Sequence, residues 1–284
     1  MRILLVRHGE SQSNCDTKLH TLIPDHEISL SSRGIEQAEY AGHCLKAYFD
    51  KQYADLYDDK IPVKDKAEKQ LNDLLGTFKG FGENSDLKRS MKDLLSKFNM
   101  NDESLLNEIK PKIKLYNSPY RRTRETAKLI LKEMKPLIHE VKEDVLLCEE
   151  QHGLFDGLED DEQEKMFPEE FKLFKKTERH NGKFWARYPH GESPFDVAIR
   201  LRQFFQSLKE DEENGVKDVI LVAHVITIKV FAMAWLNRSP EWYETEKSPG
   251  NCAIRVLEDN KDLGYIFGGH RQGQEWKYEG NANS

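Results

Sequence analysis

The fold is decided by the N-terminal stretch "RILLVRHGE" (residues 2–10), in which a short apolar run leads directly into charged side chains. The run from Ile3 to Val6 is typical of a buried strand, and turn residues normally follow such a run. Here Arg7 and His8 follow instead, so two side chains able to carry positive charge are expected at the rigid edge of a sheet. The pattern predicts a binding site for an anion at the end of this first strand.

Strands and helices are predicted to alternate along most of the remaining chain. Apolar runs indicate strands at residues 112–117, 217–224, 251–258 and 263–268, and apolar residues at helical spacing indicate helices at 31–49, 118–134 and 225–236. Alternation of this kind predicts a layered α/β fold with a largely parallel sheet. A chain of 284 residues is long enough to bury the core of one such domain.

One segment, residues 51–110, interrupts this alternation. Two runs within it, 71–78 and 87–98, carry apolar residues at helical spacing, and the turn-forming stretch "GFGENSD" (80–86) separates them. We therefore predict a single domain spanning residues 1–284 with a helical hairpin inserted at about 51–110. The sequence leaves open whether the hairpin is only a packed extension or serves as a lid or a partner-docking element.

The composition argues against several classes of partner and location. The formal net charge of −7 disfavours nucleic acid or an anionic membrane surface as the main partner, because both attract cationic proteins. The four cysteines have neither paired nor metal-ligand spacing, which favours reduced thiols. The N-terminal apolar run is too short for a secretion signal, and no segment is long enough to span a bilayer. We expect a cytoplasmic protein.

Polar groups follow each of the main predicted strands. Besides Arg7 and His8, the stretch "NSPYRRTRETA" (117–127) ends the second strand and His224 ends the third. Ligands of open α/β sheets bind beyond the carboxyl ends of the strands, so His8, Arg122 and His224 are expected to meet there. A lone buried histidine is usually a satisfied core residue, and helical arginines usually face solvent. Their coincidence at strand ends favours a functional site.

The motifs carrying these residues resemble those of a known family. In order, "LLVRHGESQSN" (4–14), "NSPYRRTRETA" (117–127), "PHGES" (189–193) and "LVAHVI" (221–226) are similar to motifs of the histidine phosphatase superfamily, in its phosphoglycerate mutase-like branch. Together with "IPDHEISLSSRG" (23–34), they resemble broad-range phosphatases of eukaryotes. The resemblance implies a three-layer α/β/α sandwich, a small phosphorylated substrate, and a reaction needing neither a cofactor nor a metal.

The resemblance also assigns roles to the residues of the first two motifs. His8 would be the nucleophile that forms a phosphohistidine, because a neutral imidazole can attack phosphorus when a backbone carbonyl holds its other nitrogen. Arg7 and Arg122 would bind the phosphoryl oxygens, for which the planar and permanently charged guanidinium is suited. Arg122 is chosen over Arg121 because it stands four residues before Thr126, as the family pattern RxxxT requires.

Further roles follow for the remaining site residues. Asn14 and His224 would donate hydrogen bonds to the same phosphate. The family's general acid is a glutamate four residues before a glycine, and spacing from Gly153 selects Glu149 over the adjacent Glu150. This carboxyl group must protonate the leaving alcohol and later activate water. Two solvated glutamates in an acidic loop are the simpler alternative.

Two departures from the family pattern keep other functions open. Val225 stands where the family usually has glycine, which either reflects a helical backbone that tolerates valine or distorts the site and weakens activity. "HVIT" (224–227) replaces the "HGNS" of cofactor-dependent mutases, and residues 150–190 lack a paired arginine. These features favour a phosphatase. The alternatives are a phosphoglycerate-type mutase and a weakly active regulatory or scaffold protein that uses the insert.

Overall fold

The computed structural model describes residues 1–54, 111–135 and 137–270. The chain divides into two units, one formed by Met1–Lys46 and Lys112–Ser284 and the other by Ala47–Pro111. The first unit contains the sheet and the candidate site. The hairpin predicted at 51–110 lies outside the described residues, apart from 51–54, so the insertion and the single-domain arrangement stay predictions.

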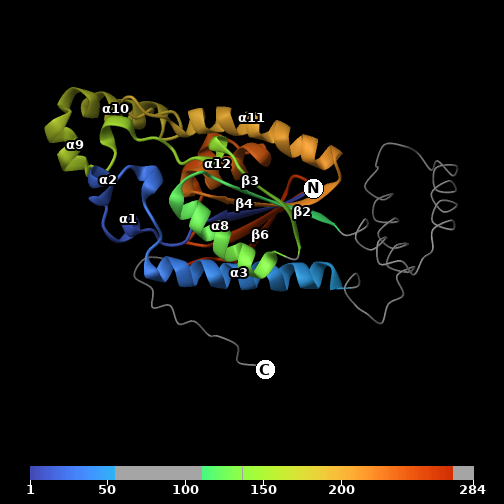
Figure 1. Cartoon of the computed structure of the whole chain (residues 1–284). Coiled ribbons are helices and arrows are strands. Elements are labelled where there is room, and N and C mark those ends of the chain that lie inside the picture. Colours follow the sequence, from blue (N-terminus) through green and yellow to red (C-terminus); the bar gives the residue numbers. More distant parts are fainter. Residues whose placement is uncertain (55–110, 136, 271–284) are drawn as a thin grey trace, which may run out of the picture. The chain divides into compact units, whose positions relative to one another are not determined.

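The described part of the chain contains one six-stranded sheet with the strand order β3-β2-β4-β1-β5-β6 (Figure 1). Its strands are β1 (Arg2–Arg7), β2 (Lys112–Asn117), β3 (Ile138–Glu143), β4 (Val216–Ala223), β5 (Ile254–Glu258) and β6 (Lys261–Phe267). Strands β3, β2, β4 and β1 are parallel to one another. Strand β5 pairs antiparallel with β1, and β6 pairs antiparallel with β5 at the edge of the sheet. The predicted, mostly parallel sheet is confirmed.

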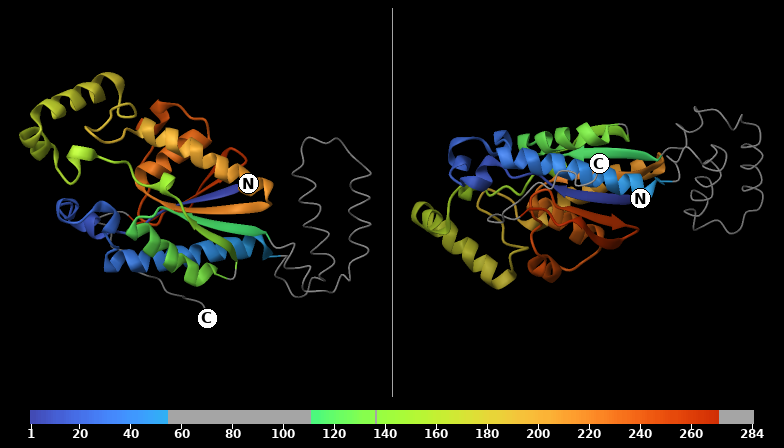
Figure 2. Two further views of the ribbon diagram at one scale, coloured as in Figure 1. Left: turned by 45° about the horizontal axis from the view of Figure 1, so that its top comes forward. Right: turned by 90° about the horizontal axis from the view of Figure 1, so that it is seen from below.

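Helices cover both faces of this sheet, which confirms the three-layer sandwich. Helices α3 (Ser32–Gln52) and α8 (Arg121–Met134) lie on one face, and α11 (Pro194–Glu213) and α12 (Val225–Trp235) lie on the other (Figures 1 and 2). Apolar side chains of β1 and β4 are buried against α11 and α12 in one cluster that includes Ile3, Leu5, Val219, Leu221, Leu201, Phe204, Val230 and Phe231. Burial of such side chains is the main stabilising term of the domain.

Short helices lie beyond the carboxyl ends of the parallel strands, where a ligand is expected to bind (Figure 1). They are α1 (Gln12–Cys15), α2 (Leu19–Leu22), the 3₁₀ turns η1 (Asp25–Glu27), η2 (Val145–Leu147) and η3 (Gly153–Phe155), and the helices α9 (Asp160–Met166) and α10 (Pro168–Asn181). A second apolar cluster, formed by Phe155, Phe174 and Ala186 with partly buried neighbours such as Tyr188, holds η3 and α10 together. Helix α13 (Pro240–Thr245) precedes β5.

The sequence prediction differs from the structure in two strands. Strand β3 was not predicted, because five of its six residues are exposed and its sequence "IHEVKE" lacks an apolar run. The strand predicted at 251–258 begins only at Ile254, since Cys252 has a left-handed backbone conformation with φ 58°. The backbone before β5 therefore forms a loop beside the end of β1.

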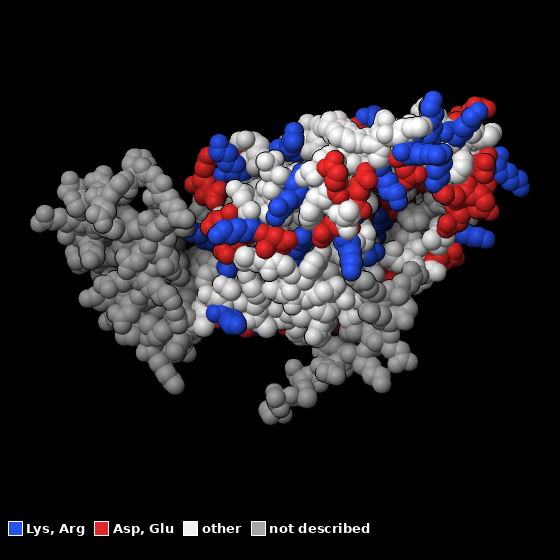
Figure 3. Space-filling view, turned by 180° about the vertical axis from the view of Figure 1, so that it is seen from behind, with Lys and Arg blue, Asp and Glu red and all other residues white. Residues whose placement is uncertain are grey.

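Figure 3 shows acidic and basic side chains next to one another on the face that it presents. None of the helices within the described ranges is long and apolar enough to cross a membrane.

Close backbone packing fixes the turn after β1. A Cβ on Gly9 would overlap the carbonyl oxygen of Gly34 at the start of α3, and a Cβ on Gly34 would overlap the carbonyl oxygen of Glu10. Neither glycine has a positive φ, so space and not backbone conformation requires them. The glycine of the "RHG" motif thus lets α3 approach the turn that carries the site.

Replacing Gly34 by alanine should lower the free energy of unfolding by about 1–3 kcal/mol, because the added methyl group collides with backbone. Alanine otherwise favours a helix over glycine by about 1 kcal/mol, so a loss isolates the close contact. Urea unfolding measures the change. Gly268→Ala is the control, since a Cβ there meets nothing within 4 Å. An unchanged or higher stability of Gly34→Ala would contradict the packing argument.

Candidate active site

The two predicted histidines lie side by side at the ends of neighbouring strands. His8 follows β1 and His224 follows β4, and the His8 N–H donates to the carbonyl oxygen of Ala223 at 3.0 Å. The ring centroids are 5.3 Å apart, and only 4% of His8 and none of His224 is exposed. The parallel pairing of β1 and β4 therefore brings together residues more than two hundred positions apart.

The ring of His8 is held in one orientation and one protonation state. Its Nδ1 lies 2.6 Å from the carbonyl oxygen of Gly9, which can only accept a hydrogen bond. Nδ1 therefore carries the hydrogen, and the neutral ring has its lone pair on Nε2. Burial lowers the pKa of His8 well below its ordinary value, and the positive charges of Arg122 and Arg7 lower it further. His8 is therefore neutral at physiological pH.

His224 is held by Ser118, a residue of the second motif to which the sequence analysis gave no role. His224 Nε2 lies 2.9 Å from Ser118 Oγ, which also accepts the N–H of Tyr120 at 3.4 Å. In the tautomer in which Ser118 donates to Nε2, the ring hydrogen of His224 lies on Nδ1. Burial, followed by the charge of Arg122, lowers the pKa of His224 well below its usual value, so the ring is neutral. In that tautomer Nδ1 is the donor of the ring.

Arg7 reaches the same region from the end of β1. Its Nη1 donates to the carbonyl oxygen of Pro249 at 2.8 Å, and burial lowers the pKa of its guanidinium. Arg7 Nε and His224 Nδ1 are both buried and have no hydrogen-bond partner within the described part of the chain. Buried donors are normally paired, so these two N–H groups fit an anion bound between them.

Arg122, and not Arg121, is the arginine that the structure places near the two histidines, where its charge acts on both. Arg121 is exposed and pairs with Glu125 on its own helix at 2.9 Å, whereas only 4% of Arg122 is exposed. Thr126 links this helix to the motif after β1. Its hydroxyl donates to the carbonyl oxygen of Arg122 at 2.8 Å and accepts the N–H of Gly9 at 3.1 Å. The RxxxT spacing therefore has a physical basis.

Asp25 holds one end of the Arg122 guanidinium, a contact that the sequence analysis missed. Arg122 Nη1 donates to the carbonyl oxygen and to Oδ1 of Asp25, both at 2.8 Å, and Nη2 donates to Oδ2 at 3.2 Å. Two of the five N–H groups, the one on Nε and the second on Nη2, form a fork on the other edge. That fork matches two phosphoryl oxygens.

The charge of Asp25 is stabilised by its neighbours. His20 Nδ1 lies 3.1 Å from Asp25 Oδ1, on the side away from the Arg122 contact through Oδ2. Burial acts to raise the pKa of Asp25, but the contacts with His20 and Arg122 outweigh it and hold the pKa well below its usual range. Asp25 therefore stays ionised at any pH relevant to activity.

Asn14 lies next to the two histidine-bearing segments. Its Oδ1 accepts the N–H of Ser11, in a capping box that starts α1, and the side-chain N–H of Asn251. Asn251 also donates to the carbonyl oxygen of His8 at 3.3 Å. The Asn14 oxygen is used in these contacts, and the predicted role of its amide nitrogen as a donor to the phosphate stays a prediction.

Glu149 lies at the N-terminus of α12, directly beside His224. Its carboxylate accepts the backbone N–H groups of Ile226 and Thr227 at 3.3 and 3.2 Å, and the Thr227 hydroxyl donates to it at 3.2 Å. Its negative charge raises the pKa of Arg7, which opposes the effect of burial on that group. Glu149 is therefore part of the same electrostatic cluster as Arg7 and His224.

Glu150 is buried but faces a different set of charges. Only 6% of it is exposed, and its Oε1 has no hydrogen-bond partner within the described ranges. Burial raises its pKa to about 9, helped by the negative charges of Glu149 and Glu192. The charges that shift its pKa are those of Glu149, Glu192, Arg200 and Asp196. His8, His224, Arg7 and Arg122 are not among them. This difference supports the choice of Glu149.

The loop that carries Glu149 and Glu150 is joined by hydrogen bonds to a distant segment, residues 189–192. The Leu154 N–H donates to the carbonyl oxygen of Pro189 at 3.0 Å, and the Glu192 N–H donates to that of Gln151 at 2.8 Å. Arg200 on α11 donates to the carbonyl oxygen of Glu149 at 3.2 Å. Backbone contacts before and within η3 therefore fix the loop in place.

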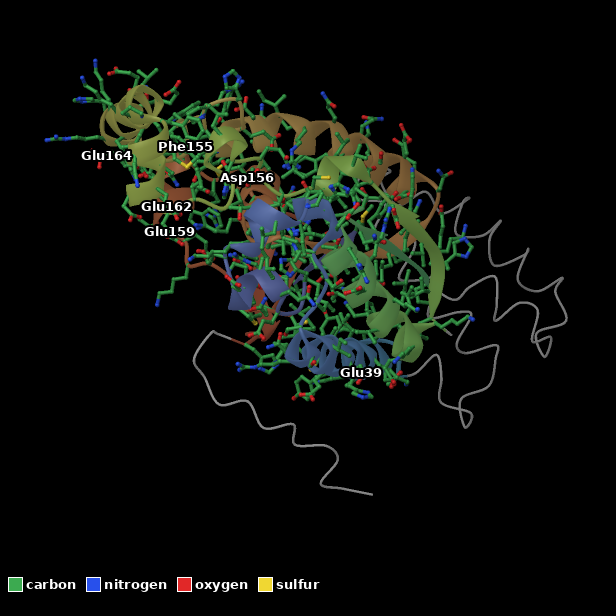
Figure 4. All side chains as sticks on the ribbon, turned by 60° about the vertical axis from the view of Figure 1, so that its left-hand side comes forward. Glu39, Phe155, Asp156, Glu159, Glu162 and Glu164 are labelled. Atoms are coloured by element: carbon green, nitrogen blue, oxygen red, sulfur yellow. The ribbon has the colours of Figure 1, made fainter. Side chains whose placement is uncertain are left out.

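The segment between Leu154 and Pro189, called the roof from here on, touches the N-terminal segment that carries α1 and α2. Figure 4 shows Phe155 and Asp156 between α9 and the segment α1–α2. A Cβ on Gly157 would meet the side chains of His20 and Thr21, so the two segments are in contact. Burial raises the pKa of the Asp156 carboxyl. The charges of Asp25 and Arg122 act on Asp156, so this part of the roof lies close to both residues.

Val225 does not disturb the backbone at the site. It is the first residue of α12, and it is not among the described non-glycine residues with positive φ. The helical alternative considered for this position is therefore confirmed. No group of three or more His, Cys, Asp or Glu residues suited to a metal ion occurs in the ranges the structure describes.

Comparison with known proteins identifies relatives along most of the chain. A phosphoglycerate mutase-like protein of Arabidopsis thaliana is 28% identical over 283 residues, covering 96% of this chain and 70% of the relative. A broad-range acid phosphatase of Saccharomyces cerevisiae is 28% identical over 311 residues, covering 92% of this chain and 86% of the relative. Both kinds of relative agree with the resemblance drawn from the motifs.

Solved structures share the fold at lower sequence identity. An alpha-ribazole phosphatase from Shigella flexneri superposes with a TM-score of 0.57 at 17% identity, covering 94% of this chain and 96% of the other. A mycobacterial glucosyl-3-phosphoglycerate phosphatase gives a TM-score of 0.54 at 20% identity, covering 90% of each chain. At these identities the likeness concerns the fold alone.

The family assignment rests on a match to a family model. The model of the histidine phosphatase superfamily (branch 1) matches residues 103–266, which is more than half of the chain. The matched stretch includes Arg122, Glu149 and His224 but begins after His8. The yeast relative, which is named as a phosphatase, supports hydrolase chemistry in this family. The chain therefore belongs to branch 1 of the histidine phosphatase superfamily.

Proposed function

We propose that the protein is a phosphomonoesterase that hydrolyses small phosphate esters through a phosphohistidine at His8. The observation that carries the proposal is the state of His8, which is buried, neutral and held by Gly9 so that Nε2 has the lone pair. Arg7, Arg122 and His224 surround it with donors for the three phosphoryl oxygens. Such preorganised charge is the largest source of rate in phosphoryl transfer.

In the first step, His8 Nε2 attacks phosphorus while the bond from phosphorus to the ester oxygen breaks. Glu149 gives its proton to that oxygen, and the alcohol leaves. In the second step, water attacks the phosphohistidine, Glu149 takes a proton from the water, and the bond from phosphorus to Nε2 breaks to release phosphate. Arg7 and Arg122 neutralise the developing negative charge, so we propose that no divalent metal is needed.

The contacts of Glu149 fit the second of these steps. Both carboxylate oxygens accept hydrogen bonds, mainly from the start of α12, so the carboxylate from which the second step begins is held in place beside His224. The first step requires the protonated form. The negatively charged substrate supplies a reason for the change, because it raises the affinity of a neighbouring carboxylate for a proton.

A phosphatase is favoured over a mutase and over a catalytically weak binding protein. The name of the yeast relative describes a broad-range acid phosphatase, whereas that of the plant relative describes a mutase-like protein. Hydrolysis of p-nitrophenyl phosphate, measured beside a coupled mutase assay, separates the two activities. Binding of inorganic phosphate without turnover in either assay would favour the binding protein.

His8→Ala should reduce hydrolysis by more than about 10,000-fold, because the nucleophile is lost. During turnover the wild-type protein should carry a phosphate group that is unstable in acid and stable in base. Peptide mapping should locate this group on His8. Because the pKa of His8 is lowered, its neutral form persists below pH 6.5, and the acid side of the kcat/KM profile should fall only below that value. Label on a serine, or an active His8→Ala, would contradict the mechanism.

Glu149→Gln should slow hydrolysis of alkyl phosphates by roughly 100- to 10,000-fold, since one catalytic proton transfer is lost. p-Nitrophenyl phosphate should suffer far less, because its leaving group needs little protonation. Glu150→Gln is the matched control and should change both substrates alike. Steady-state kinetics on the two substrates measures the selectivity. The same selective loss in Glu150→Gln, and not in Glu149→Gln, would reverse the assignment.

We also propose that Asp25 positions the Arg122 guanidinium for the phosphate. Asp25→Ala removes both side-chain contacts to Arg122, so the inhibition constant for inorganic phosphate should rise by about 10- to 100-fold. Asp25→Asn keeps one accepting oxygen and should lie between. Asp156→Asn is the control, because Asp156 makes no hydrogen bond to Arg122. Tighter phosphate binding in the Asp25 variants would show instead that Asp25 competes with phosphate for Arg122.

A further inference from the structure

Tyr120 is a buried residue that stands two positions before Arg122 in the second motif. It precedes α8 with an extended backbone, and its N–H donates to Ser118 Oγ, the same atom that contacts His224. Its carbonyl oxygen accepts the Thr123 hydroxyl at 2.6 Å. Contacts on both sides therefore fix the backbone of Tyr120, which sets the direction in which its side chain leaves the chain.

The aromatic ring of Tyr120 contacts two of the proposed phosphate ligands. The centroid of the ring lies 5.0 Å from that of the His224 ring, in a T-shaped arrangement, and 4.9 Å from the guanidinium carbon of Arg122. Both contacts are attractive, because T-shaped ring pairs and cations near an aromatic face are favourable arrangements. The ring therefore has a fixed place relative to the groups that would bind the phosphate.

The hydroxyl group of Tyr120 reaches the loop of the proposed general acid. Gln151 Nε2 lies 2.6 Å from Tyr120 Oη and 3.2 Å from the carbonyl oxygen of Glu149. A carbonyl oxygen can only accept a hydrogen bond, so the amide group presents its nitrogen, and not its oxygen, to both partners. One hydrogen of this nitrogen is then donated to Tyr120 and the other to the backbone of Glu149.

The Tyr120 hydroxyl offers Gln151 an acceptor that does not change with pH in the working range. Burial raises the pKa of Tyr120 to about 12, so the phenol is neutral at acidic and neutral pH. Gln151 itself is exposed, and its amide group depends on these hydrogen bonds for a defined position. Loss of the hydroxyl would therefore release one side of the amide without adding or removing a charge.

The main chain and the carboxylate of Glu149 are held by different parts of the structure. The carboxylate accepts the N–H groups of Ile226 and Thr227 at the start of α12. The carbonyl oxygen accepts Arg200 Nη2 at 3.2 Å as well as Gln151 Nε2 at 3.2 Å. The contact through Gln151 leads on to the segment that begins α8, and so links the backbone of the acid to the phosphate-binding side of the site.

We propose that Tyr120 is a positioning residue that couples the phosphate-binding side of the site to the general acid. His224 and Arg122 place its ring. Its hydroxyl acts through Gln151 to set the position of Glu149. This inference rests on the proposed phosphatase function, in which Glu149 transfers the proton to the leaving alcohol. A tyrosine that only packs in the core would leave this proton transfer unchanged when its hydroxyl is removed.

Tyr120→Phe keeps the ring and removes the hydroxyl, and Gln151→Ala removes the amide. The test compares kcat/KM for glycerol 2-phosphate, whose leaving alcohol needs a proton, with kcat/KM for p-nitrophenyl phosphate, whose leaving group needs little. Each variant should lower the ratio of these two values by about 3- to 10-fold, which corresponds to one hydrogen bond. The loss should lie in kcat, whereas the inhibition constant for inorganic phosphate should stay unchanged, since the ring remains. The double variant should lose no more than either single variant.

Tyr116→Phe is the matched control, because it removes another buried tyrosine hydroxyl whose hydrogen bond, to Asp211 Oδ2, is also 2.6 Å long. Neither Tyr116 nor Asp211 is a residue of the site, so the ratio should equal that of the wild-type protein. An unchanged ratio in Tyr120→Phe or Gln151→Ala, an equal fall in Tyr116→Phe, or additive losses in the double variant would overturn the coupling and leave the phosphatase intact. No hydrolysis of either ester by the wild-type protein would instead overturn the proposed function itself.

Discussion

The site depends on the position of β1 between β4 and β5. Parallel pairing with β4 brings His8 beside His224, and antiparallel pairing with β5 brings the loop before β5 beside Arg7. Groups beside these two strands therefore meet the end of β1, and α8, which follows β2, reaches it as well, since Thr126 accepts the Gly9 N–H. One pairing arrangement therefore determines which distant parts of the chain can take part in chemistry.

The same strand arrangement concentrates positively charged groups at the end of β1, and neighbouring residues limit their net charge. Two guanidinium groups and two imidazoles are packed around the end of β1, and burial of so much positive charge would be costly. Both imidazoles stay neutral because burial and the arginines lower their pKa values. Asp25 compensates Arg122, and Glu149 acts on Arg7. The cluster keeps its donors while limiting its net charge.

The sequence was informative where burial and chemistry adjoin along the chain. Strand β1 and the site residues that follow it could be predicted, because an apolar run stands next to Arg7 and His8. Strand β3 could not, since it is an exposed edge without such a run. Asp25 was missed because it meets Arg122 across 97 residues, and its own segment shows no periodicity.

The backbone hydrogen bonds between the Glu149 loop and residues 189–192 separate the roof from the candidate site. The roof, which includes α9 and α10, begins at Leu154 and ends at Pro189, and neighbouring backbone hydrogen bonds join its two ends. Such an excursion can change its length or composition while its two ends stay joined. The roof can thus vary in length or composition while Glu149 keeps its contacts with the start of α12.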